Sequence, residues 1–393
     1  MRQYRWSDYL ICLTPLPLLA YVGLDSYAID YRAFYLAGKA ALNGLDPYLN
    51  HLAISSQYYG PINAELAHYS GWKYPPLATY LFTPFAAIPY EASKNLFNLL
   101  SIALAIAAVS VAIQLSQRRL APISILVASF SFPVLATLER GQVELLLTTL
   151  ACAAVFAMAK GRTSWSAIAI GLLSALKIYP ILLAAALLRS RRTKALRAMA
   201  VGTATLALLA LITLIATPAP WRTTFMERLT IPFDQVPGQV LPTLPPDSGV
   251  IEGSNTVRTA DARNLTHSHD FVFGFANPLL KRNTVLAGII GLCGVFAALI
   301  ANRRQAQFQQ ALALMPWINI ANPLAWIMGL TWYIPLFLYS YTRVNGVMRF
   351  VLCLPLILPP SLNTSGYLAA CISLVIARYY QDAREPDPTP QRP

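Results

Sequence analysis

Long apolar stretches alternate with short polar turns along most of this chain. A helix that spans a membrane needs about 20 predominantly apolar residues, and twelve stretches reach or approach that length. These stretches cover residues 9–24, 95–115, 120–137, 142–159, 164–178, 179–189, 195–216, 284–301, 306–321, 324–341, 350–361 and 366–378. The pattern predicts an all-α polytopic membrane protein with about 12 transmembrane helices.

The composition supports this class. Of the 393 residues, 56% are hydrophobic and 12% are charged, and the mean hydropathy is +0.49. Soluble domains carry about 25% charged residues, so an ordinary soluble protein is excluded. The formal charge of +13 would suit a nucleic-acid partner. The Lys and Arg residues, however, gather in short loops between the spans, which is the pattern of cytoplasmic loops. We therefore expect no nucleic-acid partner.

Residues 164–189 decide on which side of the membrane each loop lies. If they form a tight hairpin around Tyr179-Pro180, the basic loops and both chain ends lie in the cytoplasm. If they form one bent span, everything upstream is inverted. The hairpin places nearly all of the net charge on one side, so we adopt it. It leaves two large polar segments, residues 25–92 and 217–283, on the extracytoplasmic side.

One domain accounts for nearly the whole chain. Residues 1–380 form a multi-pass domain in the cell membrane, and the Pro-rich, charged residues 381–393 form a disordered cytoplasmic tail. The outward segment 217–283 lacks clear periodicity, and we expect a mobile loop that becomes ordered when substrate binds.

The first outward segment has local structure of its own. Residues 30–43 are predicted to form a short amphipathic helix on the membrane surface, which Asn43-Gly44 ends. The apolar stretch that runs to Pro89 is short and rich in proline. It is predicted to be an interfacial or re-entrant segment and not a full span.

Asp30 is the main candidate for chemistry. It follows the first apolar stretch and opens a run of aromatic and basic residues that ends at Tyr35. A carboxylate held at the membrane edge beside such groups suits proton abstraction from a lipid-linked substrate. The alternative is that Asp30 caps the 30–43 helix, and its position alone favours the cap.

Charged residues at two outward turns are further candidates. Glu139, Arg140, Gln142 and Glu144 lie close to the lipid, where charges are unfavourable unless they pair or line a cavity. These residues form either a structural Glu–Arg pair or part of a functional site, and the sequence does not favour one interpretation over the other. Lys177 is a lone cation at the next outward turn. It either extends to the membrane interface or binds a lipid phosphate.

The second outward segment adds histidines and arginines. His267 and His269 flank Ser268, but this pair is weak support for a metal because a site needs three or four ligands. We expect neither a metal nor another cofactor. Arg222 and the other arginines of this segment have the planar group that suits phosphate, and solvated loop charge is the alternative.

Several motifs, taken in chain order, resemble the polyprenol-phosphate-mannose-dependent mannosyltransferases of glycosyltransferase family 87, which have the GT-C fold. The motifs are Asp30 with the run Phe34–Tyr48, then Tyr74-Pro75-Pro76-Leu77, Gly141-Gln142, the stretch from Gly171 through Lys177 to Pro180, and Asn322-Pro323-Leu324-Ala325-Trp326. Two positions depart from the family pattern. Ile327 follows Trp326 where the family often has histidine, and Glu144 stands where asparagine is usual.

The resemblance implies an inverting transfer on the extracytoplasmic face. A hexose, with mannose as the first expectation, would move from a polyprenyl-phosphate donor to a glycolipid or glycan acceptor, with Asp30 as the general base. A groove between the spans would admit the polyprenyl tail, and membrane lipids are the other partner. The implied residues for binding the donor phosphate and the substrates are Lys177, Arg140, Gln142, Tyr35, Tyr74, Arg222, His267, His269 and Trp326.

Two other functions share the polytopic pattern. A transporter or lipid-carrier translocase tends to show repeated halves and charged or broken helices at the midplane of the bilayer. Here the polar residues gather in two unequal outward segments. A polysaccharide polymerase or ligase shares the large loops and arginines but not the ordered motifs. Both alternatives stay open at this level.

Overall fold

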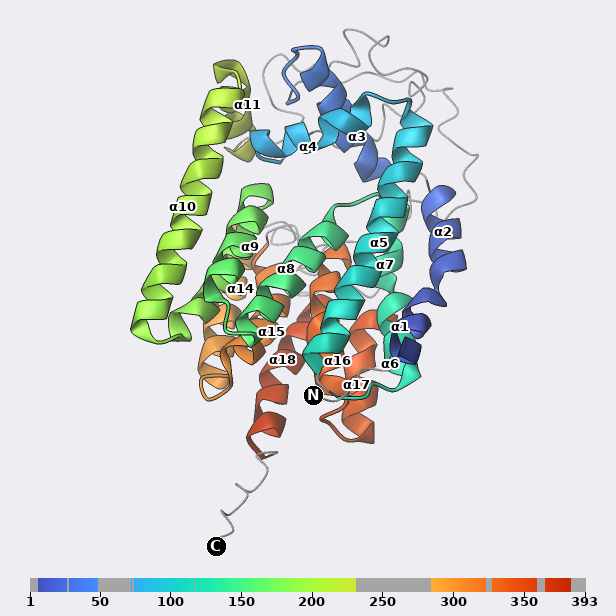
Figure 1. Cartoon of the computed structure of the whole chain (residues 1–393), viewed down its shortest axis with the longest axis vertical. Coiled ribbons are helices and arrows are strands. Elements are labelled where there is room, and N and C mark those ends of the chain that lie inside the picture. The colour runs from blue at the N-terminus through green and yellow to red at the C-terminus, as the bar shows by residue number, and fades with distance from the viewer. Residues whose placement is uncertain are drawn as a thin grey trace, which may run out of the picture.

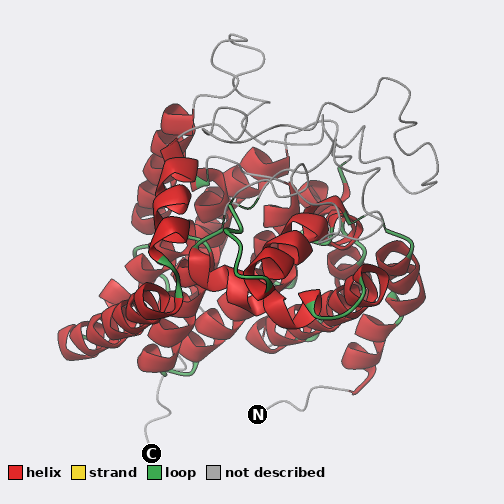
Figure 2. Ribbon diagram, turned by 90° about the horizontal axis from the view of Figure 1, so that it is seen from above, coloured by secondary structure: helices red, strands yellow, loops and turns green. Residues whose placement is uncertain are grey.

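The computed structural model describes most of the chain, and every regular element in the described part is a helix (Figure 2). The described residues are 6–26, 28–48, 72, 74–116, 118–230, 284–322, 327–358 and 365–382. In chain order the helices are α1 (Trp6–Leu13), α2 (Leu16–Leu24), α3 (Ile29–Leu42), α4 (Pro76–Ala86), α5 (Tyr90–Ser116), α6 (Pro122–Ser129), α7 (Phe132–Arg140), α8 (Glu144–Ala159), α9 (Thr163–Leu176), η4 (Tyr179–Arg189), α10 (Arg192–Ala216), α11 (Ala219–Thr230), α14 (Thr284–Ala301), α15 (Gln307–Ala321), η7 (Ile327–Tyr333), α16 (Ile334–Tyr341), α17 (Gly346–Ile357) and α18 (Ser365–Asp382). The prediction of an all-α chain is confirmed for these residues.

Three helical segments of the described part are long and apolar enough to cross a membrane on length and composition. They are Tyr90–Ser116, which is α5, Pro122–Arg140, which is α6 with α7, and Arg192–Ala216, which is α10. Other apolar helices in this part have 10–17 residues. The chain is a membrane protein, and the number of twelve spans stays a prediction.

Some of the predicted spans are broken helices. The stretch 9–24 forms α1 and α2, which meet at Thr14-Pro15. The stretch 120–137 forms α6 and α7, and Pro133 lies in the first turn of α7. Proline lacks an amide hydrogen and clashes with the carbonyl one turn earlier, so it starts a helix more readily than it continues one. The length of an apolar stretch therefore predicted one continuous helix where the structure has two.

Residues 164–189 form a hairpin. Helix α9 ends at Leu176, the backbone of Lys177 is extended at φ −141° and ψ 135°, and η4 begins at Tyr179. The two helices then pack against each other. Because η4 is a 3₁₀-helix with a rise of about 2.0 Å per residue, its eleven residues cover about 22 Å. This length is close to that of the fourteen-residue α9, so the short η4 can run back along most of it.

Several basic turns lie together at one end of the molecule. Arg343 donates from Nη2 to the carbonyl of Ser116 at 2.8 Å, which joins the α16–α17 turn to the end of α5. Arg189 donates to the carbonyl of Asn302 at 3.2 Å, which joins the η4–α10 turn to the end of α14. Turns far apart in the sequence thus lie side by side, at the lower end of the molecule in Figure 1.

The opposite end of the molecule, which we call the upper end, carries α3, α4 and α11 (Figure 1). Helix α3 crosses α4 closely, because a Cβ atom on Gly38 would lie 2.6 Å from the carbonyl oxygen of Phe82. Phe34 packs between the rings of Tyr74 and Phe82, with centroid separations of 5.2 and 4.8 Å. These contacts fix the segment that carries Asp30.

The prediction for residues 30–43 is correct for the helix and its end but wrong for its surroundings. The helix ends at Leu42, with Asn43 as its C-cap and Gly44 at φ +70°. Every residue from Asp30 to Gly38 is buried, including Arg32. Helix α3 is therefore packed inside the protein and does not lie on the membrane with one face in water.

Candidate active site

Asp30 lies in the first turn of α3 but does not cap it. The N-cap is Ala28, whose φ of 49° is left-handed, and whose amide donates to the carbonyl of Glu139 at 3.1 Å. Ala28 is the only non-glycine residue with positive φ in the described part of the chain. The capping interpretation of Asp30 is therefore wrong, and the side chain is available for another partner.

That partner is Arg140, at the end of α7. Arg140 donates from Nε to Oδ2 of Asp30 at 2.6 Å and from Nη2 to Oδ1 at 3.2 Å. The side chains of Arg140 and Asp30 are only 11% and 10% exposed, so water screens the pair weakly. A two-point contact between a guanidinium and a carboxylate fixes both position and orientation. Asp30 is thus a rigidly held, charge-compensated carboxylate.

Gly141 allows α3 and α7 to meet. It ends α7 at φ +66°, a conformation that favours glycine. A Cβ atom at this position would also lie 2.5 Å from Cβ of Tyr31 and 3.2 Å from Cβ of Ala28. The Gly-Gln motif therefore has a physical reason: only glycine lets the end of α7 approach the start of α3 closely enough to form the Asp30–Arg140 pair.

A second ion pair joins Lys177 to Glu144. The side chains are 18% and 5% exposed, and Lys177 Nζ lies 5.4 Å from the ring centroid of Tyr74 and 5.9 Å from that of Tyr179. Lys177 therefore points into the protein, and the interpretation that it extends to the membrane interface is wrong. Of the two possibilities left open for this turn, the described ion pairs show Arg140 with Asp30 and Glu144 with Lys177, and no Glu–Arg pair is among them.

Tyr74 links the two ion pairs. Its hydroxyl donates to Oε1 of Gln142 at 3.2 Å, two residues after Arg140. Burial raises the pKa of the Tyr74 hydroxyl to about 12, Lys177 acts against that increase, and the charges of Glu144 and Asp30 add to it. The phenol is accordingly a hydrogen-bond donor at neutral pH. We call Asp30, Arg140, Gln142, Glu144, Lys177 and Tyr74 the polar site.

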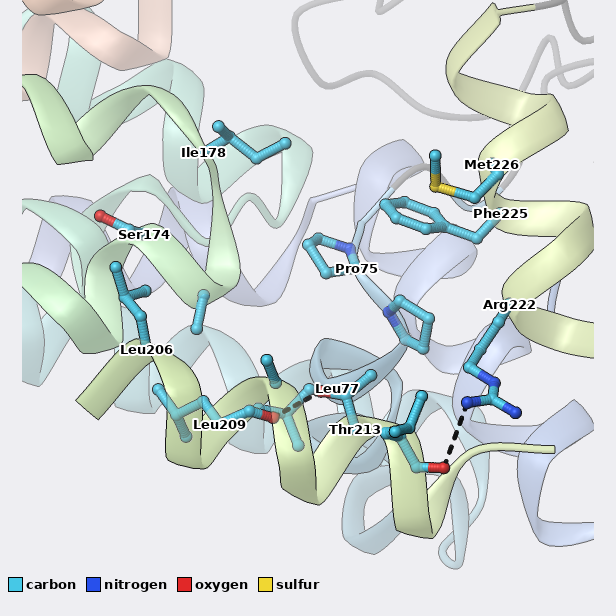
Figure 3. A pocket seen from close by; sticks show the side chains of 14 residues that line it. Pro75, Leu77, Ser174, Ile178, Leu206, Leu209, Thr213, Arg222, Phe225 and Met226 are labelled. Atoms are coloured by element: carbon cyan, nitrogen blue, oxygen red, sulfur yellow. Dashed lines mark hydrogen bonds between the residues drawn. The ribbon is translucent and has the colours of Figure 1, made fainter. Parts of the chain in front are cut away.

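An apolar cavity of about 360 Å³ opens beside the polar site, and we call it the lateral groove. Side chains from α9, α10, α11 and the start of α4 line it (Figure 3). Pro75 and Ile178 form part of its wall, and they directly follow Tyr74 and Lys177 in the sequence. Only 6% of the apolar window of α10 is buried, so this helix separates the groove from the surroundings of the protein.

Arg222 lies on the wall of the lateral groove opposite Ile178 (Figure 3). Its Nη1 donates to the carbonyl of Leu214 at 3.3 Å, and it forms no ion pair with the acidic residues that the structure describes. The groove thus combines an apolar lining with one cation that has no ion pair to a described acidic residue.

Of the remaining predicted site residues, the structure describes only Tyr35, which lies outside the polar site. The hydroxyl of Tyr35 donates to the carbonyl of Ile88 at 3.0 Å, and the ring packs against Tyr90. His267, His269 and Trp326 lie outside the described residues. Among the described residues no group of three or more His, Cys, Asp or Glu side chains could hold a metal ion.

Sequence reasoning missed the wider role of Asp46. Its Oδ1 accepts from the amide of Tyr48 at 2.9 Å, which closes a local turn. Its Oδ2 also accepts from the hydroxyl of Thr224 at 2.7 Å, and the Tyr48 ring packs on Phe225. These contacts hold α11 over the lateral groove. No local pattern signals them, because Thr224 lies 178 positions away.

The polar site and the groove suit one kind of chemistry. A buried carboxylate with an ordered position can accept a proton, cations and hydroxyl donors can hold an anionic group, and an apolar groove can take a lipid chain. Arg140, Glu144 and Lys177 lie inside the range matched by a family model, whereas Asp30 precedes it.

That family model is Glycosyltransferase family 87, and it matches residues 72–316, which is more than half of the chain. The comparison with curated proteins finds no match. The matched range begins at Trp72, continues through α4 and the two ion-paired turns, and ends within α15. The chain therefore belongs to glycosyltransferase family 87 and is a membrane glycosyltransferase.

Proposed function

We propose that the protein transfers a hexose, with mannose as the first expectation, from a polyprenyl-phosphate donor to a glycolipid or glycan acceptor. The chain crosses the cell membrane several times in a GT-C arrangement. Both termini and the basic turns lie in the cytoplasm, and the upper end with the polar site faces the extracytoplasmic side. The positive-inside rule supports this orientation, because the basic turns meet at the opposite end.

The proposal rests mainly on the burial of Asp30 and on its contact with Arg140. Asp30 is buried at the upper end, and Arg140 fixes both of its oxygens. A carboxylate has about four lone-pair positions, so each oxygen keeps one for a hydroxyl donor. Asp30 is therefore held ready to accept a proton from the acceptor hydroxyl.

The lateral groove supports a lipid-linked donor. A prenyl chain is apolar and would enter from the bilayer past α10, while its phosphate would stop where the groove meets Tyr74 and Lys177. Arg222 belongs to α11 and lines the groove, and it forms no ion pair with the acidic residues of the described part. A nucleotide sugar has no apolar chain that would occupy this groove.

The transfer is a single displacement with inversion. The acceptor oxygen attacks the anomeric carbon and passes its proton to Asp30 as the new bond forms. The bond between the anomeric carbon and the phosphate oxygen breaks, and the lipid phosphate leaves with the electron pair. Arg222, Lys177 and Arg140 stabilise the charge that grows on the phosphate. The last two are compensated by carboxylates, so they share their hydrogen bonds with the phosphate.

A donor panel tests this function. Purified protein in lipid nanodiscs is given polyprenyl-phospho-mannose, polyprenyl-phospho-glucose, GDP-mannose or UDP-glucose with a lipid extract as acceptor, and products are identified by mass. We expect transfer from a polyprenyl-phosphate sugar and none from a nucleotide sugar. Transfer from the nucleotide sugars alone would contradict the proposal.

A further inference from the structure

Exposed cations gather at the lower end of the molecule, where the turn between η4 and α10 meets the turn between α14 and α15 (Figure 1). The following exposed residues form what we call the lower cation cluster: Arg189, Arg191, Arg192, Lys194, Arg303 and Arg304. None of them forms an ion pair with an acidic residue that the structure describes. Because like charges repel one another, such a cluster attracts a negatively charged partner.

Hydrogen bonds hold the two turns of this cluster together. Arg189 donates from Nη1 to the carbonyl of Asn302 at 3.2 Å, across 113 positions of the sequence. Gln307 donates from Nε2 to the carbonyl of Ala186 at 3.0 Å and to the hydroxyl of Ser190 at 3.3 Å. The backbones that carry the cations are therefore fixed relative to each other, so cations from both turns can contact one bound group.

Exposed apolar side chains adjoin the cations on each of the helices concerned. Leu188 of η4 directly precedes Arg189, Leu196 of α10 follows Lys194 by two residues, and all but a small part of α10 is unburied. Ile300 of α14 precedes Arg303 by three residues. Leu188, Leu196 and Ile300 are each more than half exposed. The lower cation cluster thus lies at the edge of an apolar surface.

An anionic phospholipid matches both parts of this surface. Its phosphate suits the planar group of arginine, and clustered Lys and Arg residues beside a membrane span attract anionic lipids. Its acyl chains would cover the apolar side chains. An acidic protein or a nucleic acid would contact the cations and leave Leu188, Leu196 and Ile300 uncovered. A zwitterionic phospholipid matches less well, because it brings a cation of its own to the cluster.

We propose that the lower cation cluster binds the phosphate of an anionic phospholipid between the two turns. Arg191 and Arg192 contact the phosphate from one turn, and Arg303 and Arg304 contact it from the other. The acyl chains lie along the exposed apolar residues of η4, α10 and α14. The bound lipid joins α10, which lines the lateral groove, to α14. This site is separate from the polar site and does not depend on which sugar is transferred.

A competition assay with two matched variants tests the site. A fluorescent phosphatidylglycerol is bound to the purified protein in detergent and displaced by unlabelled lipids. We expect phosphatidylglycerol to bind about 10-fold or more tightly than phosphatidylcholine, since each cation near an anionic lipid contributes about fivefold. Arg303→Gln/Arg304→Gln should weaken phosphatidylglycerol binding by about 10- to 30-fold. Arg191→Gln/Arg192→Gln, in the other turn, should weaken it by a similar factor.

The control variant is Arg118→Gln/Arg119→Gln. It also removes two exposed arginines, but from the turn between α5 and α6, which lies away from the start of α10 in Figure 1. Its affinity for phosphatidylglycerol should stay within about twofold of the parent value, because it changes the total charge and not the cluster. The elution volume of each variant in detergent shows whether it is folded.

Several results would refute the site. Equal losses in the control and in the cluster variants would show attraction to total charge alone. An effect at only one of the two turns would exclude a phosphate held between them. Displacement by glycerol phosphate or by polyglutamate as readily as by phosphatidylglycerol would point to a free phosphate or an acidic protein. Sugar transfer is not measured, so these results do not depend on the proposed function.

Discussion

Replacing Arg140 with methionine removes one half of a buried ion pair and keeps much of the apolar stem. In the parent protein the two side chains are 11% and 10% exposed, and two hydrogen bonds join them. After the change, the Asp30 carboxylate stays buried without its counter-ion. Breaking a buried pair from one side destabilises a protein by about 3–5 kcal/mol, so we expect Arg140→Met to fall in that range.

The double variant Asp30→Asn/Arg140→Met should recover most of this loss. Neither position then holds a buried charge, and replacing both members of a buried pair is often close to neutral. Arg119→Met is the control, because Arg119 is exposed and a surface substitution changes stability by less than about 0.5 kcal/mol. Unfolding in mixed micelles by increasing SDS, followed by circular dichroism, measures all four proteins on one scale.

The reasoning is refuted by either of two results. A loss of less than about 1 kcal/mol in Arg140→Met would be the value of a solvent-exposed pair, and the site would then be open to water. A double variant as unstable as Arg140→Met alone would show that the loss comes from packing of the arginine stem and not from the charge left on Asp30.

Two further substitutions test the geometry around the site. Gly141→Ala should lose at least about 1–2 kcal/mol of stability and most transfer activity, because alanine is strained at φ +66° and its Cβ would lie 2.5 Å from Cβ of Tyr31; normal stability and activity would contradict this packing. Ala210→Phe places a ring in the lateral groove and should raise KM for long-chain donors by about 10-fold or more if one well-packed contact is lost. Leu208→Phe, on the exposed surface of α10 and outside the groove lining, should leave KM unchanged; equal effects of the two variants would contradict a lipid path through the groove.

The helices were largely predictable from the sequence, because apolar length and proline positions are local properties. The reversal at Lys177 was also accessible, since only a hairpin gathers the basic turns at one end. The breaks within 9–24 and 120–137 could not be predicted, because an apolar stretch has the same composition whether its helix is continuous or interrupted.

The partners in the site could not be predicted. Arg140 has acidic neighbours in the sequence at Glu139 and Glu144, yet it pairs with Asp30, 110 positions away. Glu144 pairs instead with Lys177, 33 positions later. Side-chain pairing depends on which helix ends meet in space, and the close approach at Gly141 decides that. The sequence identified the right groups but not their connections.

The burial of α3 could not be predicted from the sequence for a related reason. Its apolar residues suggested one covered face, but Asp30 and Arg32 are buried too. Asp30 is satisfied by Arg140, and Arg32 donates from Nε to the hydroxyl of Tyr90 at 3.1 Å. Polar residues that find partners inside the protein look like a solvated face when only the sequence is read.

The rate of hexose transfer by Asp30→Asn tests the central claim most directly. The variant keeps the size of the side chain and removes its ability to accept a proton, so transfer from a polyprenyl-phosphate sugar should fall by about 10²- to 10⁴-fold, the usual contribution of a general base. Asp25→Asn, an exposed carboxylate five residues earlier, should transfer at the parent rate. A folded Asp30→Asn protein that transfers sugar as fast as Asp25→Asn would show that another group takes the proton.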